Sequence, residues 1–203
     1  MRTTGDTRAR IVTAATELFR RQGYAASGMK QIVAAADAPY GSAYHFFPGG
    51  KSQLGEEVIR TSGAAYLELI AGLFPLPVPQ GADMATVTAD AFTAAARTLR
   101  ELDFTDPCPL ATIALEVAGT HESLRLATAE VFASWTDGLA AFYRAGGIAE
   151  PAAHETASSV IALLEGAFML GRAARSTDPV LAASRAAAAV VSAARSEAGA
   201  GDA

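Results

Sequence analysis

The spacing of apolar residues constrains this chain more than any other feature of its sequence. Apolar side chains recur at intervals of three and four residues, alanine is abundant, and clusters of β-branched residues are few. This period matches one face of an α-helix, whereas a half-buried strand alternates every second residue. In residues 6–22 the apolar face carries Ile11, Ala15, Leu18 and Phe19. The sequence therefore predicts an all-α fold.

Proline, glycine and capping residues divide the chain into about nine predicted helices. Gly23 suits the left-handed C-cap of the first helix, Ser27 is the expected N-cap of the second, and Pro39 fits the start of the third. The stretch LPVPQG, residues 76–81, is the clearest loop. The predicted helices span residues 6–22, 28–36, 40–46, 52–74, 82–102, 109–118, 122–144, 152–175 and 179–196.

Charge is distributed unevenly along the chain. Residues 1–60 hold eight Lys or Arg against five acids, a formal +3, and the remainder holds eight Arg against sixteen acids, a formal -8, which together give the net charge of -5. Affinity for nucleic acid comes largely from neutralising phosphates with Lys and Arg. We therefore expect any anionic partner to bind the N-terminal segment.

The sequence also indicates where the protein resides. Its one cysteine, Cys108, excludes an intrachain disulfide and is compatible with a reducing cytosol. The N-terminus lacks an apolar signal-peptide core, and the longest apolar runs are far shorter than the roughly 20 residues that cross a bilayer. We expect a cytoplasmic protein that does not interact with a membrane.

Residues 28–51 are predicted to form two short helices joined by a tight turn, the layout of a helix-turn-helix. The second helix of such a motif enters the major groove. Small residues let the backbone approach DNA, hydroxyl and imidazole groups contact phosphates, and helix N-termini attract anions. The alternative is that these residues only fill a small core. The candidate DNA-binding residues are Ser27, Gly28, Pro39, Tyr40, Gly41, Ser42, Tyr44, His45 and Lys51.

The segment DAPYGSAYHFFPGGKSQL, residues 37–54, closely resembles the recognition region of the tetracycline-repressor (TetR) family. It is most similar to the LmrA/YxaF-like branch, which usually reads GAPKGSLYHHFPGGKxQL. CPLATIALE (residues 108–116), FASW (132–135) and ALLEGAFMLGRA (162–173) look like the C-terminal domain of that branch. The resemblance implies nine or ten helices, a dimer built on the last two of them, and an inducer that releases DNA.

Three positions depart from the pattern of that branch. Asp37 replaces the glycine of the turn, Tyr40 replaces the basic residue that opens the recognition helix, and Phe46 replaces a second His or aromatic residue. Each change removes positive or neutral polar character from the DNA face. We therefore expect an operator that differs from those of close relatives, with Tyr40 contacting a thymine methyl group.

On this basis residues 1–50 are predicted to form a helix-turn-helix DNA-binding domain and residues 51–198 a ligand-binding and dimerisation domain, followed by a disordered tail, 199–203. An effector pocket should be mostly apolar with a few polar groups. For each candidate, ordinary core packing is the alternative. The candidate ligand-binding residues are Phe92, Leu99, Cys108, Thr112, Leu115, Trp135, Glu165, Phe168 and Met169.

Several of these side chains have more than one interpretation. Glu165 lies in an apolar stretch, so it needs a partner: Arg172, a residue across a dimer, or a cationic or hydroxyl-bearing ligand. Cys108 is either a redox switch or a structural residue. His121 and His154 lack a carboxylate cluster, so neither a metal site nor a cofactor is expected.

Small residues on the last two predicted helices permit close helix approach, as a two-fold dimer requires. On the first of these helices they are Ala157, Val160, Leu164, Ala167, Gly171 and Ala174, and on the second Ala183, Ala186, Ala187, Val190 and Ala194.

The favoured hypothesis is a ligand-responsive repressor that binds a palindromic operator as a homodimer and is released by a small aromatic or hydrophobic effector. The resemblance implies control of a multidrug exporter or an oxygenase gene. The alternative is a DNA-binding regulator without a small-molecule effector that acts through a protein partner. An enzyme is not expected, because the sequence has no nucleophile elbow, phosphate loop, zinc-protease motif or convincing carboxylate pair.

Overall fold

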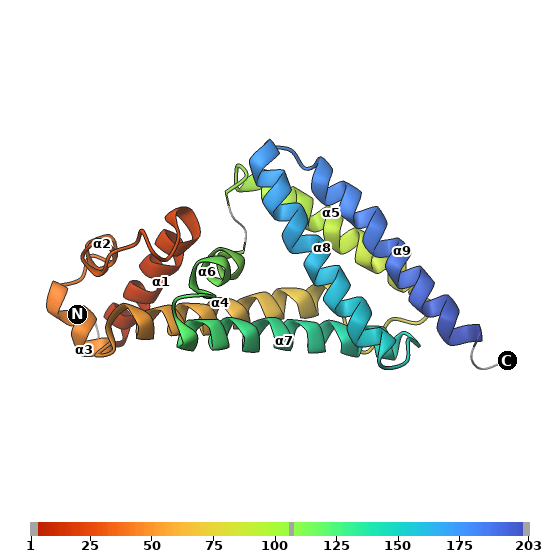
Figure 1. The fold of residues 1–203 in the computed structure, drawn as a ribbon, viewed down its shortest axis with the longest axis horizontal. Coiled ribbons are helices and arrows are strands. Elements are labelled where there is room, and N and C mark those ends of the chain that lie inside the picture. Colours follow the sequence, from red (N-terminus) through yellow and green to blue (C-terminus); the bar gives the residue numbers. More distant parts are fainter. Residues whose placement is uncertain (1–3, 106–107, 201–203) are drawn as a thin grey trace. The chain divides into compact units, whose positions relative to one another are not determined.

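The structure, a computed structural model, describes residues 4–105 and 108–200, which form nine α-helices and no β-strand (Figure 1). The all-α prediction is confirmed. Most predicted helix ends lie within two residues of those observed; the largest difference is the last helix, which continues to Ala200. The helices are α1 Thr4–Gln22, α2 Met29–Ala35, α3 Tyr40–Phe46, α4 Gly50–Leu73, α5 Met84–Glu101, α6 Pro109–Val117, α7 Glu122–Ala145, α8 Ala152–Ala174 and α9 Asp178–Ala200.

The helices pack into two compact units. The first comprises Met1–Ala65 and Cys108–Val131, and the second Tyr66–Pro107 and Phe132–Ala203. The first unit therefore contains α6 and parts of α4 and α7 as well as the three N-terminal helices. The predicted functional boundary after residue 50 stays a prediction. Of the predicted tail, residues 199–200 end α9 and 201–203 lie outside the described residues.

The core of the first unit forms where α1 packs against α2, α3 and α6. Ile11, Ala15 and Phe19 of α1 are fully buried, as their spacing predicts, and Leu18 of the same stripe is half-buried. Gly23 ends α1 with φ +87°, in the left-handed region that the C-cap requires. The predicted cap is thus confirmed.

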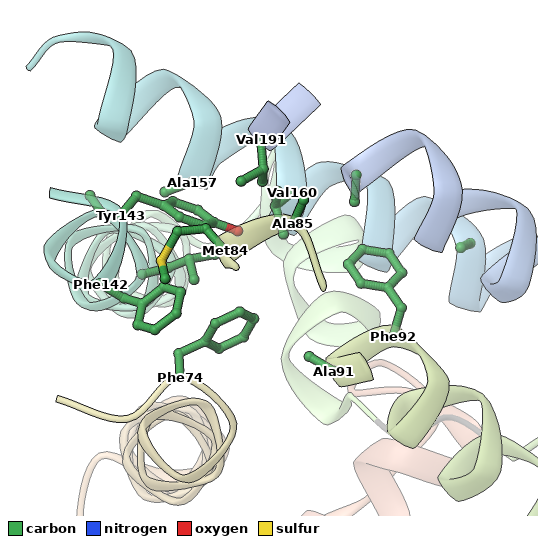
Figure 2. Packing of buried hydrophobic residues seen from close by; sticks show 14 of the residues in the cluster. Phe74, Met84, Ala85, Ala91, Phe92, Phe142, Tyr143, Ala157, Val160 and Val191 are labelled. Atoms are coloured by element: carbon green, nitrogen blue, oxygen red, sulfur yellow. The ribbon is translucent and has the colours of Figure 1, made fainter. Parts of the chain in front are cut away.

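In the second unit α9 packs along both α5 and α8 (Figure 1). Figure 2 shows the side chains that fill this core, including Phe74, Phe92 and Phe142. The Tyr143 hydroxyl is buried there and lies 2.9 Å from the Thr88 hydroxyl. Burial raises the pKa of Tyr143, because a phenolate would lose its hydration.

Helix α7 buries the single apolar seam that its near-heptad spacing predicts. Every member of the seam is buried: Leu124, Thr128, Val131, Trp135, Leu139 and Phe142.

The predicted dimer stripe of α8 is wrong for most of its members. Ala157, Val160, Ala167 and Gly171 are buried inside the second unit itself, as is Ala187 of α9. Helical periodicity identifies an apolar face but not whether the partner belongs to the same chain. Of the predicted stripe Ala174 is exposed, and the other exposed residues of α8 are His154, Glu155, Ser158, Ser159, Ala162, Met169, Leu170, Arg172 and Ala173.

Among the described residues one helix, α8, is long and apolar enough to cross a membrane by length and composition alone. The core helix of a soluble protein passes the same test. Its buried side lies in the apolar core of the second unit, so this single helix is weak evidence for a membrane span.

At Gly63 the helices α4 and α7 pack closely within the first unit. A Cβ atom at this position would overlap both methyl groups of Val131. We expect Gly63→Ala to lower the free energy of unfolding by about 1–3 kcal/mol, the usual cost of overpacking. Gly72→Ala, on the same helix but open to solvent, should raise it by up to about 1 kcal/mol. Urea unfolding at one fixed protein concentration measures the free energy of unfolding of both variants. Equal changes in Gly63→Ala and Gly72→Ala would contradict the packing argument.

Candidate DNA-binding site and ligand pocket

Helices α2 and α3 form the predicted helix-turn-helix. Helix α3 occupies Tyr40–Phe46, as the sequence predicts, and Pro39 is its N-cap with extended backbone, φ -60° and ψ 141°. Helix α2 ends at a C-cap on Ala36, and Asp37 follows with φ +48°. Glycine commonly occupies this left-handed conformation, and aspartate tolerates it better than most residues. The departure at Asp37 is therefore compatible with the turn.

Arg10 holds this turn from α1. Its Nη1 donates to the backbone carbonyls of Ala36 and Asp37, the latter at 2.8 Å, and lies 3.9 Å from the Asp37 carboxylate. Its Nε lies 3.7 Å from Asp6 Oδ2. These carbonyls follow the end of α2, where the helix leaves acceptors unsatisfied. A side chain of α1 thus fixes the angle between α2 and α3.

The exposed side of α3 carries the aromatic candidates. Tyr40 and Tyr44 are 52% and 49% exposed, with their hydroxyl oxygens 3.5 Å apart and their rings edge to face at 5.7 Å. The hydrogen bond with Tyr40 raises the pKa of Tyr44. Gly41 and His45 are exposed as well, Ser42 is half-buried, and a Cβ atom added at Gly41 would point into open space. These residues form one polar, accessible face of α3.

Ser27 does not have the predicted capping role. Gly28 is the N-cap of α2, without a side-chain cap, and Ser27 is 0% exposed. The Ser27 hydroxyl donates to the Gly23 carbonyl at 2.7 Å and accepts from the Gln22 side chain at 3.1 Å. The serine therefore closes the turn after α1, because that turn lies within reach of its short side chain, and its hydroxyl is not accessible to a phosphate in this structure. Gly28 is exposed.

Much of the positive charge of the N-terminal segment is engaged within the protein. Arg8 Nη1 lies 2.7 Å from Glu57 Oε1, and this hydrogen bond raises the pKa of Arg8. Arg20 and Arg21 both bind Glu17, whose pKa is lowered, most strongly by the hydrogen bond from Arg20. The formal +3 of this segment is therefore not an open basic surface.

Lys51 packs against the turn that follows α1. Its Nζ lies 4.3 Å from the centroid of the Tyr24 ring and donates to the Ala25 carbonyl at 3.2 Å. Desolvation lowers the pKa of Lys51, and the nearby Glu116 carboxylate acts in the opposite direction. The predicted phosphate contact of Lys51 stays a prediction, but this ammonium already has two partners in the first unit.

The second unit contains a cavity of about 140 Å³. Tyr66 of α4 and Trp135 of α7 stack on its wall, with ring centroids 5.4 Å apart and an interplanar angle of 22°. Glu165 is the charged member of the described lining and is half-buried. The lining residues are Tyr66, Leu69, Ile70, Leu73, Phe74, Ala91, Phe92, Ala94, Ala95, Thr98, Trp135, Leu139, Val160, Ile161, Leu164, Glu165 and Phe168.

The structure brings together only some of the predicted ligand-binding residues. Four of them line the cavity: Phe92, Trp135, Glu165 and Phe168. Leu99 is buried outside it, and Met169 is 60% exposed. The other three belong to the first unit, where Cys108 is buried, Thr112 is half-buried and Leu115 is 80% exposed.

Sequence reasoning missed the contribution of α4 to the cavity. Tyr66, Leu69, Ile70 and Leu73 recur at helical spacing and could have been recognised as an apolar face. The pairing of that face with Trp135 requires the tertiary structure. The assignment of Glu165 to a ligand or to Arg172 remains a prediction.

Metal-binding side chains do not cluster in residues 4–105 and 108–200, where no group of three His, Cys, Asp or Glu could hold an ion. His121 Nδ1 lies 2.9 Å from the Thr120 hydroxyl. His154 Nδ1 lies 3.6 Å from Asp137 Oδ1. The two histidines thus contact different neighbours.

Both halves of the chain match models of known protein families. Residues 11–58 match the model of bacterial regulatory proteins of the tetR family, and residues 85–186 match the LmrA/YxaF-like C-terminal domain of transcriptional regulators. The HTH-type regulator YxaF of Bacillus subtilis is 32% identical over 185 residues, which cover 89% of this chain and 93% of YxaF. LmrA of the same organism is 32% identical over 184 residues, covering 87% and 92%.

The fold is shared with solved structures of the same family. The regulatory protein TetR from Rhodobacter sphaeroides superposes with a TM-score of 0.78 at 20% identity, covering 91% of this chain and 98% of that one. Together with the helix-turn-helix geometry, these matches assign the chain. It belongs to the TetR family, in the LmrA/YxaF-like branch, and is a DNA-binding transcriptional regulator rather than an enzyme.

Proposed function

We propose that the chain is a ligand-responsive transcriptional repressor, which binds a palindromic operator as a homodimer in the cytoplasm and is released by a small aromatic or hydrophobic effector. The observation that carries the proposal is the apolar cavity of the second unit, in a chain whose first unit bears a DNA-reading motif. The alternative, a regulator that acts through a protein partner, gives no role to this cavity.

The proposed DNA contacts lie on α3 and at the helix starts. Tyr40, Tyr44 and His45 are exposed and can donate hydrogen bonds to phosphates or contact base edges. Gly41 and Ser42 allow close approach of the backbone, and exposed Gly28 and Pro39 precede the N-termini of α2 and α3. Tyr40 is the proposed specificity residue, since an aromatic edge can contact a thymine methyl group.

The DNA contacts are tested with DNA from upstream of the gene and with random DNA at several salt concentrations, by fluorescence anisotropy. Tyr44→Ala should weaken binding to both DNAs, because a phosphate contact carries no sequence information. Tyr40→Ala should lower discrimination between them by about 1–3 kcal/mol. Thr93→Ala, an exposed change on α5, is the control. Equal discrimination by Tyr40→Ala and the unmodified chain would reject the assignment.

The cavity indicates the proposed effector class. Its volume of about 140 Å³ is close to the roughly 150 Å³ that accepts benzene in an engineered apolar cavity. Stacked Tyr66 and Trp135 provide an aromatic wall. These properties favour a small aromatic effector, and a hydroxyl or cationic group on it could contact Glu165.

Trp135 reports on this pocket because it is the one tryptophan of the chain. We expect nitrobenzene, a neutral single-ring quencher, to quench its fluorescence with saturation. Ala95→Phe fills the cavity and should abolish the saturable component, whereas Thr93→Phe, exposed on the same helix, should retain it. Quenching that is linear in the unmodified chain, or equally saturable in Ala95→Phe, would exclude the pocket as the binding site.

The proposed dimer interface is the solvent-facing side of α8 and α9. On α9 this side carries Ala182, Ala186, Ala189 and Ala193, and on α8 it carries Ala162, Gly166, Met169, Leu170 and Ala173, of which Gly166 is partly buried. Small side chains let helices from two subunits approach closely, and a two-fold axis brings the same patch together twice.

A charge in the centre of this patch should prevent dimerisation, because the symmetry would bury two like charges without partners. We expect Ala186→Glu and Met169→Glu to sediment as monomers and to lose operator binding at micromolar concentrations. Ala133→Glu, an exposed change on α7, should sediment like the unmodified chain. A dimeric Ala186→Glu variant would place the interface elsewhere.

A further inference from the structure

Glu116 of α6 binds the backbone of the turn that follows α1. One carboxylate oxygen accepts from the Tyr24 N–H at 3.1 Å and the other from the Ala25 N–H at 2.7 Å. The two partners are separated from Glu116 by more than ninety positions in sequence. Hydrogen bonds to a charged acceptor are stronger than those to a neutral one. This side chain thus fixes the path by which the chain leaves α1 and enters the helix-turn-helix.

The turn is shaped to receive this carboxylate. Gly23 has φ +87°, and a Cβ atom there would overlap Glu116 Oε1. Two features therefore favour glycine at position 23: the positive φ of its backbone and the close approach of the Glu116 carboxylate.

Lys51, at the start of α4, binds the same turn through the backbone carbonyl group of Ala25. Its Nζ donates to the Ala25 carbonyl and lies over the Tyr24 ring, which also makes edge-to-face contacts with Phe19 at 5.2 Å and His121 at 5.4 Å. Glu116 and Lys51 thus hold the N–H and the C=O of Ala25 respectively. We call these two residues the turn clamp.

The clamp connects parts of the chain that are far apart in sequence. Helix α6 belongs to the segment Cys108–Val131 of the first unit, and the chain enters the second unit at both ends of this segment. Three residues separate Ala25 from Met29, the first residue of α2. A displacement of α6 therefore acts on the turn that orients α2 and α3.

We propose that Glu116 and Lys51 are positioning residues for DNA binding: they orient the helix-turn-helix through the turn Gly23–Ala25, and neither contacts a phosphate. The proposal uses the DNA binding of the family and does not depend on the effector. It departs from the assignment of Lys51 as a phosphate contact, and the two roles give opposite results in the experiments below.

The first experiment measures Glu116→Ala with DNA selected from a random-sequence pool by the unmodified chain. Removing an acid from a protein surface should leave DNA affinity unchanged or raise it. A positioning role instead predicts an affinity lowered about tenfold, because two charge-assisted hydrogen bonds are lost. Glu122→Ala removes an exposed acid of α7 that pairs with Arg125 and is the matched control. Wild-type or higher affinity for Glu116→Ala would overturn the proposal.

Amide hydrogen exchange locates the effect in the same variants. Exchange at Tyr24 and Ala25 should accelerate about tenfold or more in Glu116→Ala, and remain unchanged in Glu122→Ala, at equal thermal stability. If Glu116→Ala does not fold, Glu116→Gln carries the test, since its amide keeps one acceptor oxygen. It should show a smaller loss of affinity with faster exchange at one or both amides, and wild-type behaviour in both measurements would overturn the proposal.

The second experiment separates the two roles of Lys51 by salt dependence. A lysine that neutralises a phosphate contributes about 0.9 to the slope of log affinity against log salt concentration. Lys51→Met keeps the aliphatic stem over Tyr24 and removes the charge. We expect lower affinity with an unchanged slope. A slope smaller by about 0.9 would show a direct phosphate contact and overturn the proposal for Lys51, and an unchanged affinity would do so as well.

Discussion

The arrangement of the DNA-reading unit depends on how the backbone is held where α1 ends. A helix C-terminus leaves carbonyl groups without partners, and the turn beyond it exposes N–H groups as well. Here Gly23 reverses the chain with a positive φ, and Glu116 binds the next two N–H groups. Arg10 does the equivalent for the turn between α2 and α3 by binding the carbonyls of Ala36 and Asp37. Side chains outside the two short helices therefore determine the orientation of both.

This use of charge affects how the protein can bind DNA. Arg8, Arg10, Arg20 and Arg21 contact acids or carbonyls of their own unit, so they cannot contribute fully to phosphate neutralisation. On the exposed side of α3, Tyr40 stands in place of the usual basic residue. Binding should thus depend more on hydrogen bonds, helix N-termini and shape than on net charge, with a shallow salt dependence.

The helices, including α3 and the seam of α7, could be predicted because proline, glycine and apolar spacing act locally. The role of Ser27 could not be predicted, because a serine before a helix can either cap that helix or donate to a carbonyl earlier in the chain. Here its hydroxyl donates to the Gly23 carbonyl. The partner of Ala25 lies on α6, beyond the range of any local pattern. The apolar face of α8 could be predicted, but not its partner. A stripe of small residues has the same spacing whether it packs on the core of its own chain or on a second subunit.

The cavity and the DNA-reading unit share two continuous helices. Helix α4 contributes Gly63 to the first unit and Tyr66 to the cavity, and α7 contributes Val131 and Trp135 in the same way. Each pair is less than two helical turns apart. In the proposed mechanism, a ligand that parts the Tyr66 and Trp135 rings acts on the same two helices that carry Gly63 and Val131. Release of DNA by the proposed effector would require it to bind more tightly to the rearranged state than to the DNA-bound one, by at least the free-energy difference between the two states.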